Sequence, residues 1–323
     1  MVTLESILSL VDVKTMHCSV LCKELLEIFE GKSIRVLWDG TLGAGGHTAA
    51  LLQAHPEIEW AVGVDRDPSA LDIASERLLP WRDKVRLLRG NFHDLSRQVE
   101  QLAPPSIDAL LLDLGVSSMQ IDRADRGFSW QREGPLDMRM DPSQSLTAAT
   151  IVNEWSEESL GEIFRSFGEE PQWRFAASLI VKKRKECHLR TTRELTELLA
   201  PMQHYHRRQI HYATLIFQAL RLAVNGELEA LESVLPQALR VVSPLGRLVV
   251  ISFHSLEDRI VKQFFRHAAS DKLFTEGIAG LFLDKQPEVE LLTRKAKKPS
   301  EEEIRENPRA RSARLRAVQK LAS

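Results

Sequence analysis

Residues 34–48, IRVLWDGTLGAGGHT, carry the strongest structural signal in this chain. An apolar run ends in Asp39, glycines follow at positions 40, 43, 45 and 46, and the pattern then becomes helical over 48–55. Glycine lets the backbone turn sharply and approach a ligand closely because it has no Cβ atom. The first turn of a helix presents N–H groups without intrahelical partners. The stretch therefore predicts a strand, a ligand-binding loop and a helix.

Four further apolar runs, each of strand length, lie downstream. They are WAVGVD (60–65), VRLLR (85–89), IDALLLD (107–113) and RLVVISF (247–253), and residues 68–79 are helical in pattern. Strands that are apolar throughout and alternate with helices are typical of a parallel sheet covered on both faces. We therefore predict an α/β fold with a mostly parallel, Rossmann-like sheet.

The fourth and fifth predicted strands are separated by more than 130 residues, far more than a crossover connection needs. Apolar residues recur at helical spacing from Leu160 to Phe167, and Thr191 with Glu194 forms a capping box. We expect a mostly helical domain inserted into the sheet domain. The expected parts are 1–119 (core, first part), 120–207 (helical substrate-recognition domain) and 208–323 (core, second part, with a basic C-terminal segment).

Side chains near the ends of the predicted strands suit an adenosine-containing cofactor. Asp65 ends the second strand about 20 residues after the glycine loop, where a carboxylate can accept hydrogen bonds from both ribose hydroxyls. Phe92, after the third strand, offers a face for adenine. Asp113 ends the fourth strand and should lie at the same cleft, because ligands bind at the carboxyl ends of parallel strands.

The glycine loop follows neither of two common nucleotide-binding patterns. It lacks the GxGxxG spacing of dinucleotide sites and the P-loop pattern, GxxxxGK followed by Ser or Thr. Two cofactors are therefore compatible with the loop and Asp65. One is an NAD-like dinucleotide, and the other is S-adenosylmethionine, which shares adenosine but has no pyrophosphate.

Charge is balanced overall but uneven along the chain. Lys and Arg number 43 against 45 Asp and Glu, a net charge of −2, so any binding to nucleic acid must come from local patches. Residues 182–193 carry six basic side chains against Glu186, and residues 294–320 carry ten against four glutamates. Each of these two segments is either an ordinary solvated surface or a candidate surface for binding nucleic acid.

The remaining composition favours a cytoplasmic protein. No apolar run approaches the roughly 20 residues that span a bilayer, and the first residues lack the features of a secretory signal. Three scattered cysteines indicate reduced thiols. His17, Cys18 and Cys22 lack a fourth ligand, so no metal site is expected.

Several further blocks closely resemble one family, the bacterial 16S ribosomal RNA (cytosine-N4) methyltransferases of type H. The blocks are HCSVLCKELL (17–26), DGTLGAGGHT (39–48), GVDRDPSAL (63–71), DLGVSS (113–118), RGFSW (126–130), PLDMRMD (135–141), FQALRLAVNGEL (217–228), ISFHSLEDRIVK (251–262) and NPRARSARLR (307–316). They cover nearly the whole chain in order, and the last two are specific to this family.

The resemblance implies a class I methyltransferase core with an inserted helical domain. It implies S-adenosylmethionine as cofactor and, as substrate, a cytidine in the decoding centre of 16S rRNA within the small ribosomal subunit, without DNA or a membrane as partner. Carried over by position, the cofactor-binding residues are Gly45, Gly46, His47, Asp65, Phe92, Asp113 and Gln120.

The chain departs from the family pattern at three positions. Tyr212 and Leu215 stand where the family has Pro and Arg in His-Pro-Ala-Thr-Arg, and Pro171 stands where it has Arg after Gly-Glu-Glu. All three concern the region expected to face RNA, so they bear on substrate contact and not on cofactor binding.

The chemistry of methyl transfer to cytosine limits which side chains are candidates for catalysis. Methyl transfer to the weakly nucleophilic amine of cytosine depends on alignment and on an acceptor for its N–H groups. Asp113 is the expected catalytic residue, with Asp137 and His254 as weaker candidates. A methyltransferase acting on a protein or small molecule, and a ribosome assembly factor without turnover, are the alternative functions.

Overall fold

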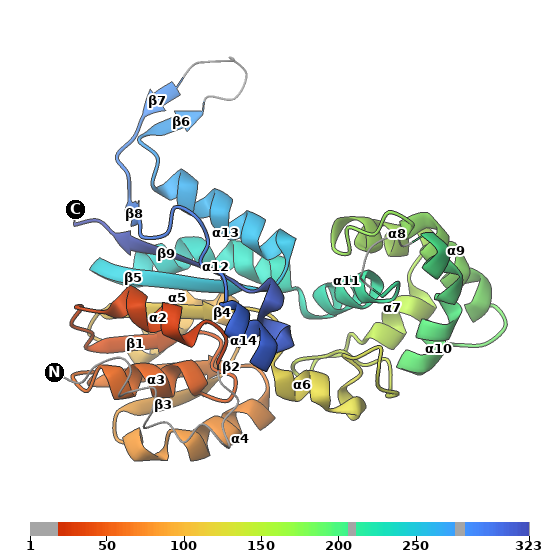
Figure 1. The fold of residues 1–323 in the computed structure, drawn as a ribbon, viewed down its shortest axis with the longest axis horizontal. Helices are drawn as coiled ribbons and strands as arrows, with labels where there is room; N and C mark the ends of the chain where they lie inside the picture. Colours follow the sequence, from red (N-terminus) through yellow and green to blue (C-terminus); the bar gives the residue numbers. More distant parts are fainter. Residues whose placement is uncertain (1–18, 206–210, 275–281, 323) are drawn as a thin grey trace. The chain divides into compact units, whose positions relative to one another are not determined.

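The computed structural model describes residues 19–205, 211–274 and 282–322. The chain forms two compact units: one comprises the described residues up to Gly115 together with those from Ala230 onward, and the other comprises Val116–Glu229. His17, Cys18 and the predicted boundary at 207/208 lie outside the described residues. Figure 1 shows the chain as a ribbon coloured along the sequence.

The first unit is built on a seven-stranded sheet of order β3-β2-β1-β4-β5-β9-β8. The strands are β1 (Val36–Asp39), β2 (Trp60–Asp65), β3 (Val85–Arg89), β4 (Ile107–Asp113), β5 (Val242–Ser252), β8 (Val289–Leu291) and β9 (Arg314–Lys320). The first five pair in parallel, and β9 runs antiparallel to both β5 and β8. The prediction of a mostly parallel, class I methyltransferase-like α/β fold is confirmed.

Helices cover both faces of this sheet (Figure 1). On one face lie α2 (Cys22–Phe29), α3 (Gly46–Ala54) and α4 (Pro68–Arg77); on the other lie α5 (Leu95–Leu102), α12 (Glu227–Val241) and α13 (Ser255–Ala268). Alternate residues of each strand enter the two cores, as Leu37 and Trp38 of β1 do. Burial on both faces explains why the strands are apolar throughout.

The strand order reverses between β1 and β4, whose neighbours β2 and β5 continue the sheet in opposite directions. In open α/β sheets ligands bind at such a switch point, outside the carboxyl ends of the strands. The end of β1 leads into the glycine loop, and the end of β4 is Asp113. The topology therefore places both predicted features at the same point.

The sheet differs from the sequence prediction on its β5 side. Residues 243–246, expected as a turn before a strand at 247–253, lie inside β5, which begins at Val242. The register with β4 shifts between Ile107 and Ala109, and Leu245 adopts a left-handed φ of 64°. An irregularity of this kind allows Pro244 and Gly246, which usually interrupt strands, to lie within one. Strands β8 and β9 were not expected.

The second unit is helical around one apolar core. Its helices are α6 (Ser118–Asp122), α7 (Ala148–Glu154), α8 (Glu157–Ser166), α9 (Trp173–Arg184), α10 (Thr192–Leu198) and α11 (Thr214–Asn225). The expected capping box of Thr191 and Glu194 opens α10. The unit spans 116–229 where we expected 120–207, because α11 packs its apolar face, including Ile216 and Leu220, into the same core as α7 and α8.

Short elements complete the described chain. They are η1 (Leu79–Trp81), η2 (Phe92–Asp94), η3 (Ala124–Arg126), η4 (Ala200–Tyr205), β6 (Lys272–Phe274), β7 (Phe282–Asp284), α14 (Glu301–Glu306) and η5 (Pro308–Ser312). Strands β6 and β7 pair with each other as a separate two-stranded sheet. Among the described residues, every helix is too short or too polar to cross a membrane.

Candidate active site

The glycine loop is fixed at its base by Asp39, the last residue of β1. The buried Asp39 carboxylate accepts the Thr48 hydroxyl at 2.7 Å and the Thr41 N–H at 3.1 Å. Burial raises the pKa of Asp39 to about 6, although the bond from Thr48 and the charge of His47 oppose that rise. The Thr41 hydroxyl in turn accepts the N–H of Asp113. The loop after β1 is thereby tied to the end of β4.

Two glycines of the loop meet different demands. Gly45 is the N-cap of α3 with φ 76°, a left-handed conformation that suits glycine. Gly46 lies so close to Ser19 that a Cβ atom would collide with the serine hydroxyl. Gly43, also left-handed at φ 52°, has open space where a side chain would stand. The main chain at Gly43 is therefore accessible, while Gly45 and Gly46 bring the start of α3 close to its neighbours.

Asp65, at the end of β2, faces this loop. One carboxylate oxygen accepts the Gly43 N–H at 2.8 Å, and the other accepts the Asp67 N–H at 2.9 Å. Burial raises the pKa of Asp65, although both main-chain bonds act in the opposite direction. A carboxylate held by two N–H donors has a fixed orientation and keeps further lone pairs for a ligand.

Asp113 closes the other side of the switch point. Its side chain is 26% exposed, but Oδ1 is buried and has no hydrogen-bond partner among the described residues. Burial, and then the nearby charge of Glu257, raise the pKa of Asp113 to about 8. A buried carboxyl oxygen without a partner is costly, and such groups concentrate at functional sites.

His47 lies beneath these groups on α3. Its Nε2 lies 2.9 Å from the Val20 carbonyl oxygen, and its Nδ1 lies 3.5 Å from Asp113 Oδ2. The side chain is 6% exposed, and burial lowers its pKa. Both ring nitrogens face other groups of the protein. His47 therefore contacts Val20 and Asp113 and does not face solvent.

Phe92 and Gln120 complete the predicted set. Phe92 begins η2 after β3, and its Cβ would lie 3.4 Å from a Cβ placed on Gly40. Gln120 belongs to the second unit, where its Oε1 accepts the Ser117 N–H at 3.0 Å and closes a capping box on α6. The structure therefore brings six of the seven predicted residues together around the ends of β1 to β4, and Gln120 lies in the other unit.

The family model of the MraW methylases matches residues 14–321. The chain belongs to the MraW methylase family. It is 52% identical over 307 residues to ribosomal RNA small subunit methyltransferase H of Protochlamydia amoebophila, covering 94% of this chain and 97% of the relative. The protein of the same name from Syntrophotalea carbinolica is 48% identical over 308 residues, covering 94% and 98%. A solved rRNA methylase from Streptococcus thermophilus, 12% identical, covers 93% and 94% with a TM-score of 0.41.

As an MraW-family methylase, the chain uses S-adenosylmethionine, and the site fits that cofactor. Asp65, oriented by the N–H groups of Gly43 and Asp67, keeps lone pairs of the kind that ribose hydroxyls bind in such folds. The loop from Asp39 to Thr48 lacks the GxGxxG spacing with which dinucleotide sites bind a pyrophosphate. Of the two cofactors that the sequence leaves open, S-adenosylmethionine is the correct one.

The two weaker catalytic candidates of the methylase have structural partners. The Asp137 carboxylate pairs with the Arg139 guanidinium through two bonds of 2.9 and 2.7 Å. Burial alone would raise the pKa of Asp137, but the bonds and charge of Arg139 hold it below its ordinary value. His254 is the N-cap of α13, with Nε2 3.2 Å from Glu257 Oε1. Asp137 lacks an unpartnered oxygen of the kind that Asp113 has, whereas the buried Nε2 of His254 makes no hydrogen bond among the described residues.

Two residues of the methylase site escaped the sequence analysis. Thr41 links the loop to Asp113, and Glu257 sets the electrostatic surroundings of Asp113. Thr41 sits inside the glycine-rich block and Glu257 inside the family-specific HSLED sequence. Both blocks stand out in the sequence, but no rule of residue spacing predicts that Glu257 lies near Asp113.

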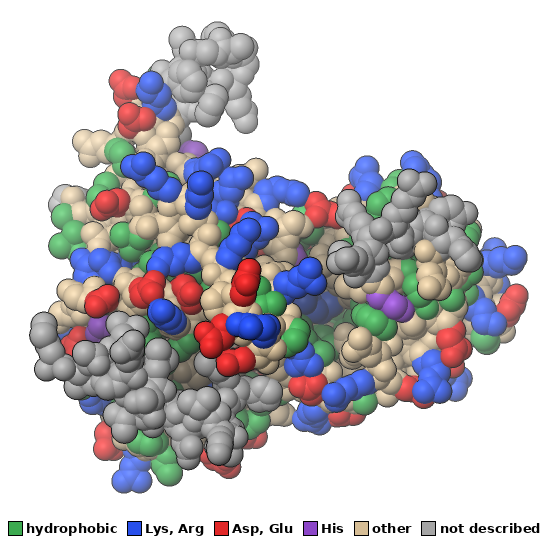
Figure 2. All heavy atoms as spheres, in the orientation of Figure 1, with side chains coloured by type: hydrophobic (Ala, Val, Ile, Leu, Met, Phe, Trp, Pro, Cys, Tyr) green, Lys and Arg blue, Asp and Glu red, His purple; other side chains and the backbone are tan. Residues whose placement is uncertain are grey.

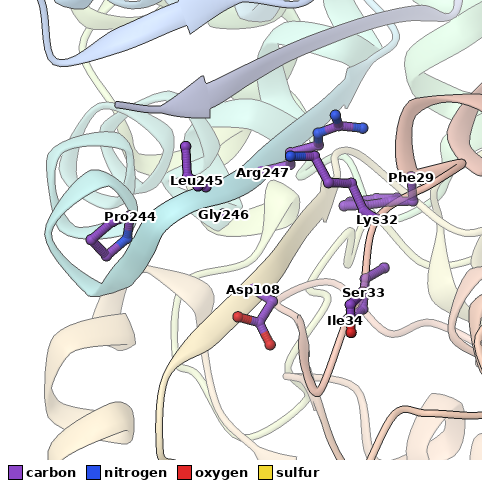
Figure 3. Close-up of a pocket in the computed structure, with 9 residues that line it drawn as sticks. All are labelled: Phe29, Lys32, Ser33, Ile34, Asp108, Pro244, Leu245, Gly246 and Arg247. Carbon is purple, nitrogen blue, oxygen red and sulfur yellow. The ribbon is translucent and has the colours of Figure 1, made fainter. Parts of the chain in front are cut away.

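A cavity of about 200 Å³ in the methylase lies elsewhere (Figure 3). Its lining includes Ile34 before β1, Asp108 near the start of β4, and Gly246 in the early part of β5. These are the amino ends of the strands, roughly 20 Å from the carboxyl ends at about 3.3 Å per residue of β4. The cavity is separate from the candidate active site.

The two basic segments of the methylase differ in which of their Lys and Arg side chains are exposed and which are paired with acidic residues. At the end of α9, Lys182 and Lys185 are exposed, whereas Lys183 pairs with Glu186 at 3.2 Å. In the C-terminal segment, Arg316 is buried in a paired contact with Asp258. The exposed basic residues there are Arg294, Lys295, Lys298, Arg305, Arg309, Arg311 and Arg314.

Helix α13 adds basic residues that lie outside both segments. Arg259, Lys262 and Arg266 recur at i, i+3 and i+7, with Arg259 and Arg266 exposed. Figure 2 shows Lys and Arg side chains gathered over α13 on the face in view. A search for runs of charge along the sequence misses a stripe of this kind, because intervening residues point elsewhere.

Proposed function

We propose that this chain transfers a methyl group from S-adenosylmethionine to the exocyclic N4 of a cytidine in the decoding centre of 16S rRNA. The substrate form is the small ribosomal subunit, in the cytoplasm. The observation that carries the proposal is Asp113: a partly exposed carboxyl at the switch point, tied to the glycine loop through Thr41, with one oxygen lacking a partner among the described residues.

The residues of the site act mainly by alignment. The cofactor supplies an electrophilic methyl group when it is bound. Asp65 and the main chain at Gly43 orient the ribose, and Asp113 accepts an N–H of the target amine, so that the amine lone pair points at the methyl group. Holding reactants in this way replaces much of the entropic barrier. An acceptor fixed in a site with little water costs no reorganisation during the reaction.

The second unit supplies the RNA contacts in this proposal. The indole of Trp130 stacks on the His211 ring with centroids 3.6 Å apart and planes 5° apart, and Tyr212 lies 4.0 Å beyond. Single-stranded bases stack well on such aromatic surfaces. The exposed Lys182 and Lys185 suit phosphates. The relatives named ribosomal RNA small subunit methyltransferase H support the same substrate class.

The three departures from the family pattern fall in this unit. Tyr212 joins the aromatic stack, Leu215 lies in the first turn of α11, and Pro171 lies between α8 and α9. Leu215 stands in place of the family's Arg and Tyr212 in place of its Pro, so this chain has an apolar side chain and an aromatic ring there. We therefore assign RNA recognition here more to stacking and to the lysines of α9 than to an arginine at those positions.

The test uses small subunits from cells that lack this enzyme, labelled S-adenosylmethionine and the full chain. N4-methylcytidine in digested 16S rRNA is the expected product, identified by mass spectrometry. Label on cytosine carbon 5 or on a ribose would contradict the chemistry. Label on protein would support the protein-substrate alternative, and binding without any transfer would support an assembly factor.

A further inference from the structure

The two ring nitrogens of His47 have different partners that fix where its protons lie. A carbonyl oxygen accepts only, so Nε2, 2.9 Å from the Val20 oxygen, carries a hydrogen. In the neutral ring Nδ1 then holds a lone pair, and it faces Asp113 Oδ2 at 3.5 Å. A lone pair facing an ionised carboxylate oxygen is repelled. The arrangement is satisfied when one proton lies between the two atoms.

Burial of both groups, together with the charge of Glu257 beside Asp113, places that proton on the carboxyl group. The carboxylates of Asp39 and Glu303 near His47 act in the opposite direction, but burial has the larger effect on the ring. Burial lowers the pKa of His47, and burial together with Glu257 raises the pKa of Asp113 to about 8. At neutral pH the resting pair is therefore a neutral carboxyl beside a neutral imidazole, with Oδ2 and Nδ1 3.5 Å apart.

We propose that His47 is a positioning residue that takes up, through Asp113, the proton lost by the methylated amine. This inference rests on the proposed function. N4 gains a bond to carbon while the carbon–sulfur bond breaks and its electron pair goes to sulfur. An N4 proton passes to the Asp113 carboxyl as the Oδ2 proton passes to Nδ1 of His47. The positive charge of the sulfonium is thereby matched by one on the imidazolium, and Asp113 stays neutral.

The contacts around His47 suit the charge that it receives. Nε2–H of an imidazolium is a stronger donor to the Val20 oxygen than that of a neutral ring, and the carboxylates of Asp39 and Glu303 face the ring. His47 does not touch the substrate in this scheme. Its effect passes through Asp113, which explains why its side chain is directed into the protein and not toward open space.

The test compares His47→Gln with His55→Gln. The amide of Gln can still donate to Val20 but offers no basic nitrogen toward Asp113. His55 is a matched control, because it is a buried histidine at the opposite end of α3, paired with Glu57 at 3.0 Å. For His47→Gln we expect a loss of about 100-fold in the single-turnover methylation rate. The rate is measured at saturating S-adenosylmethionine, so that a change in cofactor affinity does not enter it, and we expect His55→Gln to match the wild type.

Two further measurements distinguish a proton acceptor from a structural residue. They are the pH dependence of the methylation rate and the position of the hydrogen on the His47 ring. In the wild type the rate should fall at acidic pH as His47 becomes protonated, and this acid limb should be absent in His47→Gln. Nitrogen NMR of histidine-labelled protein without RNA should show a ring with hydrogen on Nε2 and a hydrogen-bonded Nδ1, and this signal should vanish in His47→Gln.

Failure of this inference differs from failure of the proposed function. A wild type that makes N4-methylcytidine, together with a His47→Gln variant that keeps its rate and acid limb, overturns the relay alone. A ring with hydrogen on Nδ1 overturns it as well. A wild type that makes no N4-methylcytidine overturns the proposed function and with it the proton transfer.

Discussion

The carboxylate of Asp65 accepts the N–H of Gly43 at 2.8 Å, so the acid at the end of β2 supports the loop that follows β1. Replacing Asp65 by Ala should remove the ribose acceptor and loosen the loop together. Loss of hydrogen bonds to a charged acceptor costs about 1.5–3 kcal/mol, which corresponds to a rise of about 10- to 150-fold in the Kd for S-adenosylmethionine. Titration calorimetry measures it. Asp72→Ala, an exposed acid on α4, should leave the Kd unchanged; equal affinities for both variants would contradict the assignment of Asp65.

Asp113→Asn should separate activity from stability. We expect methyl transfer to fall by about 10²–10³, because the amide replaces a carboxyl that exchanges protons and accepts from the amine. The folded protein should survive, and circular dichroism after purification checks this. Full activity in Asp113→Asn would remove Asp113 from the mechanism.

The stability change of the same variant should depend on pH. The pKa of Asp113 is raised to about 8 in the folded state, so its contribution to stability is complete below the unfolded value near 3.9 and is lost as pH rises through 8. Asn does not ionise. The free energy of unfolding of Asp113→Asn, relative to wild type, should therefore rise between pH 5 and pH 8, by an amount on the order of 2 kcal/mol. Urea unfolding at both pH values tests this, and a difference that stays constant with pH would refute it.

Charge reversal at the end of α9 should weaken RNA binding specifically. With Lys182, Lys183 and Lys185 changed to Glu, the slope of log affinity against log salt for small subunits should become shallower, by about 0.7 for each lost single-strand phosphate contact. Lys182 and Lys185 should account for most of the change, because Lys183 already pairs with Glu186. Cofactor affinity should be unaffected, and Lys23→Glu, at an exposed lysine of α2 outside both basic segments, serves as a single-reversal control. An unaltered slope would make this patch an ordinary solvated surface.

Asn225→Ala should destabilise the second unit. The buried Asn225 side chain accepts the Met140 N–H at 2.8 Å and donates to the Met138 carbonyl at 2.8 Å. Leaving these main-chain groups unpaired should cost about 2–4 kcal/mol of unfolding free energy. Gln218→Ala on the same helix removes a bond to the Phe167 carbonyl, and should cost less than half as much. Equal losses in the two variants would contradict the special role of Asn225.

Local patterns predicted the centre of the sheet well. The expected segments 60–65, 85–89 and 107–113 coincide with β2, β3 and β4, because strands buried on both faces leave an uninterrupted apolar run. Strand β9 was missed although the alternation of Arg314, Leu315 and Arg316 is a strand pattern, because these residues were interpreted only as part of a basic segment. Its Arg316 is buried only through the ion pair with Asp258 of α13, a partner that is 58 residues away and that no local pattern reveals.

The site was predictable to the extent that strand ends define it. Asp65 and Asp113 follow from the strand-end rule, and the structure places both at the switch point. The contact between His47 and the Val20 carbonyl oxygen could not be predicted, because the two residues are 27 positions apart and meet only through tertiary packing. In the second unit, blocks that resemble functional motifs also have structural roles. Arg126 donates to the Arg139 and Met140 carbonyls, and with Asn225 it holds Met138 in a left-handed conformation, φ 61°.

The arrangement of β4, β5 and β9 sets an order of folding during synthesis. Residues 116–229 are contiguous, so this unit can fold on the nascent chain as soon as it has emerged. The sheet cannot, because β4 must wait for β5, and β5 pairs over six residues with β9 from the far side of the chain. Such long-range pairing is slow. Until β9 enters the sheet, the N–H and C=O groups along the outer edge of β5 stay unpaired, and an exposed strand edge of this kind is prone to pair with other chains.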